Sequence, residues 1–556
     1  MHKKCTGQSV TAKTDLNSRL ILIFAVIVIL CFFISAVLTL PNYGVAWDEG
    51  LGNMFFGERY CYYLTSFNSK YLDFKTELSI KKTLPLKLFQ SPFHDFPYEF
   101  PALADTLSAA SMHFFAYRLS WLDPVDGFHL FTIVLSTAML AIFYAFVRKR
   151  LGSLTAIFSL LFLATFPRLW SDMHFNVKDV PEMVFYCLTI ISFLWWYKNR
   201  RVYKAILTGV LFGCTLAIKA NAIFLPLILL LGIIPWSFPG KAWKSFFIHI
   251  KTSLLHYLGM AVSALLIYFL SWPYLYSEPS RIKGYWHYII SQGGRSSESI
   301  FNFQPLGMTF STMPAVMLVF LIIGSVSIFL ILRRSKNTLW KVILLWMWIP
   351  VIRVSLPGMQ NFDGTRHFLK FLPAAAIIAG EGVSFSINAL SRANKKMIPV
   401  LAAAVAILIS INIGWITTKF HPYQYLYFND ISGGVSKAQQ RYGASETTDY
   451  WAVSYRQGLR WLNEYAEQGS SLFVPIARWV VDIPADIWLR DDITIITDDN
   501  RGDVFYNNQP VYVMMITREE FYEEIAQYCH ENLTPVYEIS VESHPIMQIY
   551  KIEPQE

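Results

Sequence analysis

The feature that most constrains this chain is a series of long apolar segments separated by short basic connections. Hydrophobic residues make up 54% of the 556 residues and charged residues only 15%, which is far from the balance of a soluble globular protein. A helix of about 20 apolar residues crosses the roughly 30 Å hydrocarbon layer of a bilayer. The sequence therefore predicts an α-helical polytopic membrane protein.

Twelve segments are candidate membrane spans by hydropathy, at about residues 20–40, 101–120, 127–147, 152–168, 181–197, 204–218, 221–236, 253–272, 312–332, 339–356, 367–387 and 397–417. If all twelve crossed the membrane, the basic clusters at 148–150 and 198–201 would lie outside the cytoplasm, against the positive-inside rule. Segment 101–120 is the poorest candidate because charged and titratable residues interrupt it. We therefore predict about 11 spans and assign 101–120 to an interfacial helix.

This assignment places all five basic clusters on the cytoplasmic side, at residues 148–150, 198–204, 241–251, 333–341 and 392–396. The first apolar segment follows several lysines but ends in Leu40-Pro41-Asn42-Tyr43 rather than in a small-residue cleavage site, so it is interpreted as a retained signal anchor. Residues 1–19 then form a cytoplasmic tail. The sidedness of everything downstream depends on two short spans within 204–236, separated by Lys219-Ala220-Asn221.

The predicted transmembrane domain covers residues 20–417, and its first external loop covers residues 41–126. After residue 418 the long apolar segments stop. Alternating segments typical of strands follow at 493–497, 511–517 and 547–552, and helical patterns at about 454–467 and 518–531. We predict a small extracytoplasmic α/β domain over residues 418–556 and a location in the cytoplasmic (inner) membrane.

Two adjacent carboxylates, Asp48 and Glu49, directly follow the first span. Adjacent acids repel each other and gain little from an anionic membrane surface, so a simple anchoring role explains them poorly. Other polar residues fall on the same predicted side of the membrane: Glu99, Asp172, His174, Lys178, Asp179, Arg295, Asp363, Arg366 and His367. Each also has a plainer explanation as a helix-end charge; an acid such as Asp179, two residues before a proline, can simply open a helix.

Acids beside cations at a lipid surface suit one kind of reaction. A carboxylate can activate a hydroxyl nucleophile while cations hold a phosphate leaving group. The sequence shows no Gly-rich phosphate loop, and the net charge of +8 resides in short connections rather than in a nucleic-acid-binding patch. A lipid-linked donor would explain the lack of a visible nucleotide-binding motif.

The order of these motifs resembles a known family. An acid pair after the first span, a Pro-x-Leu helix at Pro101, an outer Asp followed by Lys-Asp-x-Pro (178–181) and an Arg-His pair opening a late span resemble family 39 membrane glycosyltransferases. These GT-C fold enzymes include protein O-mannosyltransferases and the aminoarabinose transferase of lipid A. The resemblance covers roughly residues 15–390, and the segment 423–429 with Gly433-Gly434 is also similar to bacterial members.

The resemblance implies an inverting transferase that moves a sugar from a polyprenyl-phosphate donor to a hydroxyl or amine of a protein, lipid or glycan. It implies that Asp48, beside Glu49, is the catalytic base or organises the acceptor, and that Asp172 or Asp179 is the second acid. Glu99 would support the first loop.

The family's usual first-loop cation is replaced here by Phe100, so the predicted phosphate contacts are Lys178, Arg295 and Arg366, with His367 as a hydrogen-bond donor. A divalent metal ion shared by Asp48 and Asp179 remains an open alternative.

Two other functions are alternatives to this prediction. A transporter or flippase of lipid-linked saccharides is expected to carry charges near mid-bilayer or paired broken helices, and neither pattern is evident in the sequence. A non-catalytic scaffold would present the C-terminal domain and would not need the acid pair. In that domain the aromatic residues Tyr450, Trp451 and Tyr455 are explained either as a sugar-stacking surface or, more simply, as core.

Overall fold

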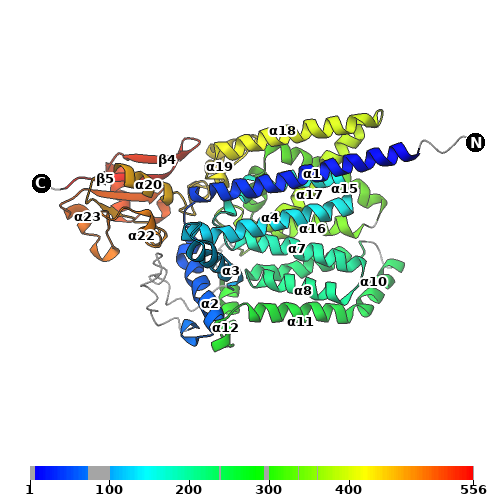
Figure 1. Ribbon diagram of the computed structural model, residues 1–556, viewed down its shortest axis with the longest axis horizontal. Helices are drawn as coiled ribbons and strands as arrows, with labels where there is room; N and C mark the ends of the chain where they lie inside the picture. Colours follow the sequence, from blue (N-terminus) through cyan, green and yellow to red (C-terminus); the bar gives the residue numbers. More distant parts are fainter. Residues whose placement is uncertain are drawn as a thin grey trace, which may run out of the picture.

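The computed structural model describes residues 7–72, 101–236, 240–292, 300–335, 337–359 and 361–554. It consists of a bundle of long helices with an α/β domain beyond one end of the bundle (Figure 1). The N-terminus and helix α10 lie at the opposite end. Two predicted site residues, Glu99 and Arg295, fall outside the described residues.

Within the described residues, seven helical segments are long and apolar enough to cross a membrane. They are built on α1 (Gly7–Thr39), α4 (Pro124–Leu151), α7 (Asp179–Lys198), α15 (Ala315–Arg334), α16 (Thr338–Ser355), α17 (Leu372–Leu390, preceded by the 3₁₀ turn η8, Arg366–Phe371) and α18 (Ile398–Lys419). A pair bent by 55°, α10 (Lys241–Thr252) and α11 (Leu254–Leu270), adds an eighth candidate span.

Three shorter apolar helices complete the bundle: α5 (Ser153–Ala164), α8 (Val202–Leu216) and α9 (Leu225–Ile233), the last preceded by the 3₁₀ turn η7 (Ala220–Phe224). Apart from α10, whose residues were predicted as a cytoplasmic basic cluster, these helices coincide with the eleven predicted apolar segments, including the two short ones on either side of Lys219. The predicted α-helical polytopic fold is therefore confirmed.

Helix α4 shows how the sequence sets a span. The Asp123 carboxylate caps its first turn by accepting hydrogen bonds from the amides of Val125 (2.7 Å) and Asp126 (3.3 Å), and Pro124 occupies the first helical position. Three basic residues fill the last turn at the other end, where they face the negative end of the helix dipole. The two ends of the span thus differ in charge.

Small residues bring α15 and α17 into close contact. A Cβ atom on Gly324 would meet the carbonyl oxygen of Ile378, and one on Gly382 would meet that of Phe320. Such close backbone approach is typical of helix pairs in membranes, where packing rather than the hydrophobic effect drives association. Helix α17 of this pair directly follows η8, which carries Arg366.

Short helices lie between the bundle and the α/β domain. They are α2 (Met54–Ser66), α3 (Leu103–Met112), α6 (Pro167–Asp172), α12 (Tyr274–Ser277), α13 (Arg281–Gln292) and α14 (Gln304–Ser311). Figure 1 shows α2 and α12 crossing the end of the bundle at a steep angle to the spans. Helix α3 continues directly into the π-helical turn η6 (His113–Arg118), and the two together are shorter than the roughly 20 residues that cross a bilayer.

The α/β domain contains a five-stranded sheet in the order β2-β1-β3-β5-β4. Its strands are β1 (Ser471–Phe473), β2 (Thr494–Ile495), β3 (Val511–Ile516), β4 (Tyr537–Val541) and β5 (His544–Ile552). Strands β2, β1 and β3 run parallel, whereas β5 is antiparallel to both β3 and β4. Every residue of β3 is buried, as expected for a central strand.

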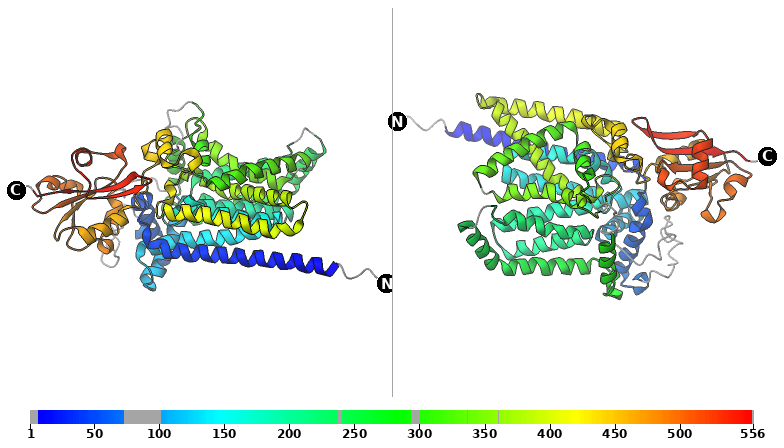
Figure 2. Two further views of the ribbon diagram at one scale, coloured as in Figure 1. Left: turned by 90° about the horizontal axis from the view of Figure 1, so that it is seen from above. Right: turned by 180° about the vertical axis from the view of Figure 1, so that it is seen from behind.

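The helices of this domain are α19 (Gly434–Tyr442), α20 (Tyr455–Tyr465), α21 (Trp479–Asp482), α22 (Ala485–Trp488), α23 (Asp503–Tyr506) and α24 (Glu524–Asn532). The predicted C-terminal α/β domain is confirmed. Both views in Figure 2 keep this domain at the end of the bundle opposite the N-terminus.

Candidate active site

The two acids of the opening pair lie in different environments. The Asp48 side chain is 33% exposed and forms an ion pair with Arg366, a residue 318 positions away in the chain. Glu49 is 1% exposed. Its carboxylate accepts hydrogen bonds from the Ala46 amide (2.8 Å) and lies 3.0 Å from Nε2 of buried His129. Burial raises the pKa of Glu49 well above its usual range, and the Asp48 charge adds to this shift.

Arg366 is the hub of the charged residues at this end of the bundle. Besides Asp48, its guanidinium contacts Asp363 (2.9 Å) and Asp179 (3.4 Å), and it is 9% exposed. Asp179 also forms an ion pair with Lys219. We refer to Asp48, Asp179, Lys219, Asp363 and Arg366 as the acid–cation centre. Segments from four distant parts of the chain meet there.

Local sequence positions the second acid. Asp179 opens α7, and the side-chain oxygen of Asn176 accepts a hydrogen bond from its amide (2.8 Å), while the Asn176 amide group donates to the Asp179 carboxylate (3.1 Å). The acid sits in the first turn of the helix, where the helix dipole favours a negative charge. The helix-opening role of Asp179 and its place in the centre are therefore compatible.

The loop that carries Asp363 has an unusual backbone. Asp363 and Gly364 both have positive φ angles, of 58° and 73°. A side chain at Gly364 would collide with the guanidinium of Arg168. The amide of Gly364 donates to the buried carboxylate of Glu446 (2.5 Å), which comes from the C-terminal domain.

Asp172 lies apart from Asp48. It is fully buried, and its partner is Arg168, whose Nε lies 3.5 Å from the carboxylate. Burial raises the pKa of Asp172 to about 6, against the opposing effect of Arg168. Asp179, rather than Asp172, is the acid that shares Arg366 with Asp48.

Lys178 is engaged elsewhere. Its Nζ donates to the Asp105 carboxylate at 2.5 Å and to the Pro101 carbonyl at 2.8 Å. Burial outweighs this cation and raises the pKa of Asp105 to about 6. The pair holds α3 against the start of α7, so a phosphate contact by Lys178 would have to replace one of these bonds.

A second set of charges lies deeper in the bundle. Lys370 donates to Glu182 (2.6 Å) and to the side-chain oxygen of Asn221 (2.8 Å), and both charged groups are almost fully buried. Buried charges in a membrane domain are costly unless they are paired. This pair ties α7, η7 and η8 together beneath the acid–cation centre.

Arg353 and His367 retain hydrogen-bonding capacity. Arg353 donates to the His367 carbonyl (3.3 Å), and no carboxylate of the described residues forms an ion pair with it. The Nε2 atom of His367 is buried and, among the described residues, has no hydrogen-bond partner. Arg353 ends α16, and His367 lies beside Arg366 in η8.

The described residues do not suit a shared metal ion. They contain no group of three His, Cys, Asp or Glu side chains arranged to hold one. Asp48 and Asp179 are both neutralised by Arg366, and Asp179 also by Lys219. The two carboxylates that would share the metal ion are therefore paired with cations instead.

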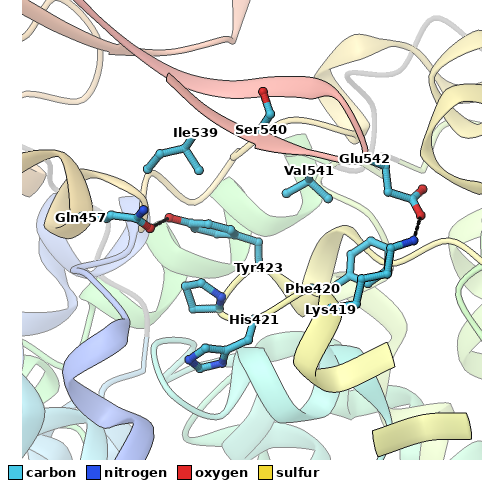
Figure 3. Close-up of a pocket in the computed structure, with 10 residues that line it drawn as sticks. Lys419, Phe420, His421, Tyr423, Gln457, Ile539, Ser540, Val541 and Glu542 are labelled. Atoms are coloured by element: carbon cyan, nitrogen blue, oxygen red, sulfur yellow. Dashed lines mark hydrogen bonds and ion pairs between the residues drawn. The ribbon is translucent and has the colours of Figure 1, made fainter. Parts of the chain in front are cut away.

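A separate cavity lies at the junction of α18 and the C-terminal domain (Figure 3). It is lined by Lys419, Phe420, His421, Pro422, Tyr423, Gln457, Ile539, Ser540, Val541 and Glu542. In Figure 3, Lys419 points to Glu542 and Tyr423 points to Gln457, with bonds of 2.5 and 2.8 Å. None of its lining residues belongs to the acid–cation centre.

Sequence reasoning missed several members of this region. Lys219, Glu182 and Lys370 were not singled out as site residues. Glu182 carried a spacing signal, because it lies three residues after Asp179 and the two acids share one face of α7. Lys219-Ala220-Asn221 was noted only as a break between two short spans.

The helix bundle has a known fold. The chain has the GT-C fold of membrane glycosyltransferases and resembles enzymes of that fold. The family of dolichyl-phosphate-mannose-protein mannosyltransferases matches residues 123–272, which include Asp172, Lys178, Asp179 and Lys219. No curated protein matches the sequence.

The chain is similar to particular solved structures. The crystal structure of ArnT from Cupriavidus metallidurans bound to undecaprenyl phosphate matches with a TM-score of 0.50 and 12% identity, over 95% of this chain and 97% of that chain. The oligosaccharyltransferase AglB from Archaeoglobus fulgidus, in complex with an inhibitory peptide and a dolichol-phosphate, matches with a TM-score of 0.47 and 10% identity, over 89% of this chain and 70% of that chain.

Proposed function

We propose that this protein is an inverting glycosyltransferase. It takes a sugar from a polyprenyl-phosphate donor and transfers it to a hydroxyl or amine of a protein, lipid or glycan acceptor. Three findings support this proposal: the family match over residues 123–272, the shared fold with ArnT, and an acid–cation centre at one end of the spans. The basic connections favour the extracytoplasmic side of the cytoplasmic membrane for that centre.

The exposure of Asp48 is the observation that carries the proposal. Asp48 is 33% exposed, whereas the Asp179 and Asp363 side chains that share Arg366 are 1% and 8% exposed. A general base must come within hydrogen-bond reach of the proton that it removes. Within the acid–cation centre, Asp48 is the carboxylate best placed to meet an acceptor.

The reaction proposed is a single displacement. The acceptor oxygen or nitrogen attacks the anomeric carbon and loses its proton to Asp48. The bond from the anomeric carbon to the phosphate oxygen breaks, and the polyprenyl phosphate leaves with the electron pair. Attack opposite the leaving group inverts the anomeric configuration. Arg366 holds Asp48 in place, and Asp179 and Asp363 hold Arg366.

The donor phosphate needs cationic side chains that are not already paired with carboxylates. Arg366 already contacts three carboxylates, and Lys178 is bonded to Asp105. Arg353 is better suited, because it forms no ion pair with the described carboxylates and its guanidinium can grip a phosphate with two N–H groups. We propose that Arg353, with Nε2 of His367, contacts the donor phosphate.

A reconstitution assay tests the proposed function. The purified full-length protein is placed in liposomes with a panel of radiolabelled polyprenyl-phosphate sugars and with protein, lipid and glycan acceptors. We expect the label of one donor class to move to an acceptor. If no donor gives up its sugar, the proposal is wrong, and the transporter and scaffold alternatives gain support.

The phosphate contact is tested with matched arginine variants. Arg353→Met should raise the KM for the donor by about tenfold or more, because a hydrogen-bonded charge contact contributes about 1.5–3 kcal/mol. Arg334→Met removes an exposed arginine at the other end of the bundle and should leave KM unchanged. Equal KM values for the two variants would contradict the assignment of Arg353.

A further inference from the structure

The C-terminal domain encloses the residue that precedes Asp48. The amide of Trp47 donates to the Trp451 carbonyl (2.7 Å), and the indole N–H of Trp479 donates to the Trp47 carbonyl (3.3 Å). The guanidinium of Arg518 lies 5.3 Å from the centre of the Trp47 ring. Both backbone polar groups of Trp47 are thus held by side chains or backbone from beyond residue 420.

The same domain also contacts Arg366. The guanidinium of Arg366 lies 4.3 Å from the centre of a Trp451 ring, within the range of a cation–π interaction. Trp451 is 1% exposed. Its ring therefore forms a fixed wall that restricts where the planar guanidinium can lie. Trp451 contacts Arg366 through its side chain and the neighbour of Asp48 through its backbone.

The turn that carries Trp451 is itself held in place. The buried Asp449 carboxylate accepts hydrogen bonds from the amides of Trp451 (3.2 Å) and Ser454 (2.8 Å) and from the Tyr425 hydroxyl (2.5 Å). Ala452 adopts a φ of 61°, a conformation that costs energy for a residue with a Cβ atom. A turn that keeps a strained residue must be fixed by its surroundings.

Tyr450 extends the same turn to Asp363. Its hydroxyl accepts a hydrogen bond from Arg168 (2.5 Å), and the same Arg168 nitrogen donates to the Asp363 carbonyl (2.9 Å). Arg518 donates to the Tyr450 carbonyl (3.3 Å) and lies 3.6 Å from the Asp363 carboxylate. The turn that carries Tyr450 and Trp451 is therefore connected to Asp363 through Arg168 and Arg518, and to Asp48 through its neighbour Trp47 and its partner Arg366.

We infer that the turn Asp449–Ser454 of the C-terminal domain is a positioning element of the acid–cation centre, and that Trp451 is its principal residue. Trp451 fixes Arg366 and Trp47 relative to each other, and thereby fixes the Asp48 carboxylate. This inference rests on the proposed function. The C-terminal domain then belongs to the catalytic apparatus and is more than a module displayed by the bundle.

Burial argues against a direct contact between this turn and the sugar. Tyr450, Trp451 and Tyr455 are each 1% exposed, so their faces are covered by protein. The positioning role therefore predicts an effect on the chemical step and little effect on substrate binding. A residue that stacked on a substrate would instead change KM.

Substitutions at Trp451 test the inference in the reconstituted full-length protein. Trp451→Leu should lower kcat by about 100-fold, because a small misplacement of catalytic groups costs about that much. It should change the KM for the donor and the KM for the acceptor by less than about threefold. Trp451→Phe keeps an aromatic face toward Arg366 and should recover at least about tenfold of that loss.

Two further variants complete the design. Trp461→Leu is the matched control, since Trp461 stacks on Tyr537 at 5.2 Å within the same domain and touches no residue of the acid–cation centre. Its kcat should stay near the wild-type value. If Trp451→Leu does not fold, Tyr450→Phe decides: it removes only the hydroxyl that bonds to Arg168 and should lower kcat by about tenfold without changing KM.

The outcomes separate the two proposals. If the wild-type protein transfers no sugar from any donor, the proposed function fails. If the wild type is active but Trp451→Leu has the same kcat as Trp461→Leu, the inference is overturned and the proposed function stands. A change in KM alone at Trp451 would also overturn the positioning role.

Discussion

The two ends of the helix bundle differ in how several of their charges are held. At the end that carries the N-terminus, residues such as Arg334, Lys395 and Lys396 are exposed. At the other end, Asp179, Arg366 and Lys370 are buried and paired across distant segments. Exposed basic residues at helix ends set the orientation of a membrane protein. Buried and paired charges are costly in a membrane domain and therefore indicate a functional site.

The largest effect is expected at the hub of the buried end. Arg366→Met would leave Asp48, Asp179 and Asp363 without their shared cation. Removing one partner of a buried ion pair costs about 3–5 kcal/mol of unfolding free energy, so we expect a strong loss of thermal stability together with loss of transfer. Unfolding of the detergent-purified protein measures the first effect, and the liposome assay measures the second.

Arg366→Lys sharpens this test. Lysine keeps the charge but lacks the planar fork that reaches several carboxylates at once. It should restore most of the stability and little of the activity. Wild-type activity in the lysine variant would contradict the geometric role of Arg366.

The next largest effect is expected at the deeper pair. Lys370→Met leaves the Glu182 carboxylate buried without its cation and should lower the unfolding free energy by about 3 kcal/mol. The double variant Lys370→Met/Glu182→Leu removes both charges and should recover most of that loss. A double-mutant cycle with thermal unfolding measures the coupling. Additive effects would show that the pair contributes no mutual stabilisation.

A smaller, pH-dependent effect is expected at Glu446. Burial raises its pKa from 4.5 to about 7, partly offset by the hydrogen bond from Gly364. Because the folded protein binds the proton more tightly than the unfolded chain, the contribution of Glu446 to stability is complete below about pH 4.5 and is lost as the pH rises through 7. Glu446→Gln should flatten the dependence of the melting temperature on pH between 4.5 and 7. An unchanged slope would contradict this assignment.

The smallest effect is expected at the exposed end. Lys395→Gln/Lys396→Gln should change the unfolding free energy by less than about 0.5 kcal/mol, because both side chains are exposed. Transfer by correctly inserted protein should stay at the wild-type rate. A loss of activity in correctly inserted protein would contradict the prediction that the exposed lysines at this end are not needed for transfer.

Much of the fold was predictable because hydropathy and charge act locally. A run of apolar residues such as 20–40 gives a span wherever it occurs, and basic clusters fix alternate connections to one side. The short apolar helices on either side of Lys219 were also predicted by this reasoning. In the C-terminal domain, the two strands β1 and β4 were missed; β1 has only three residues and every one is buried, so it shows no alternation.

The site was less predictable because its partners are distant in sequence. The sequence singled out Asp48, Asp179 and Arg366 separately, but their contact depends on how α7 and η8 pack. Lys178 stands next to Asp179 yet bonds to Asp105, because neighbours at the start of a helix point in different directions. The contribution of Trp451 required the placement of a whole domain.

We propose that Asp48 is the base of a transfer reaction at the end of the bundle that carries the acid–cation centre. The most direct measurement compares sugar transfer by Asp48→Asn with that by Asp430→Asn, which changes an exposed acid outside the centre. We predict that Asp48→Asn lowers kcat by at least about 100-fold while expression and membrane insertion stay normal, and that Asp430→Asn is fully active. Full activity in Asp48→Asn would contradict the account.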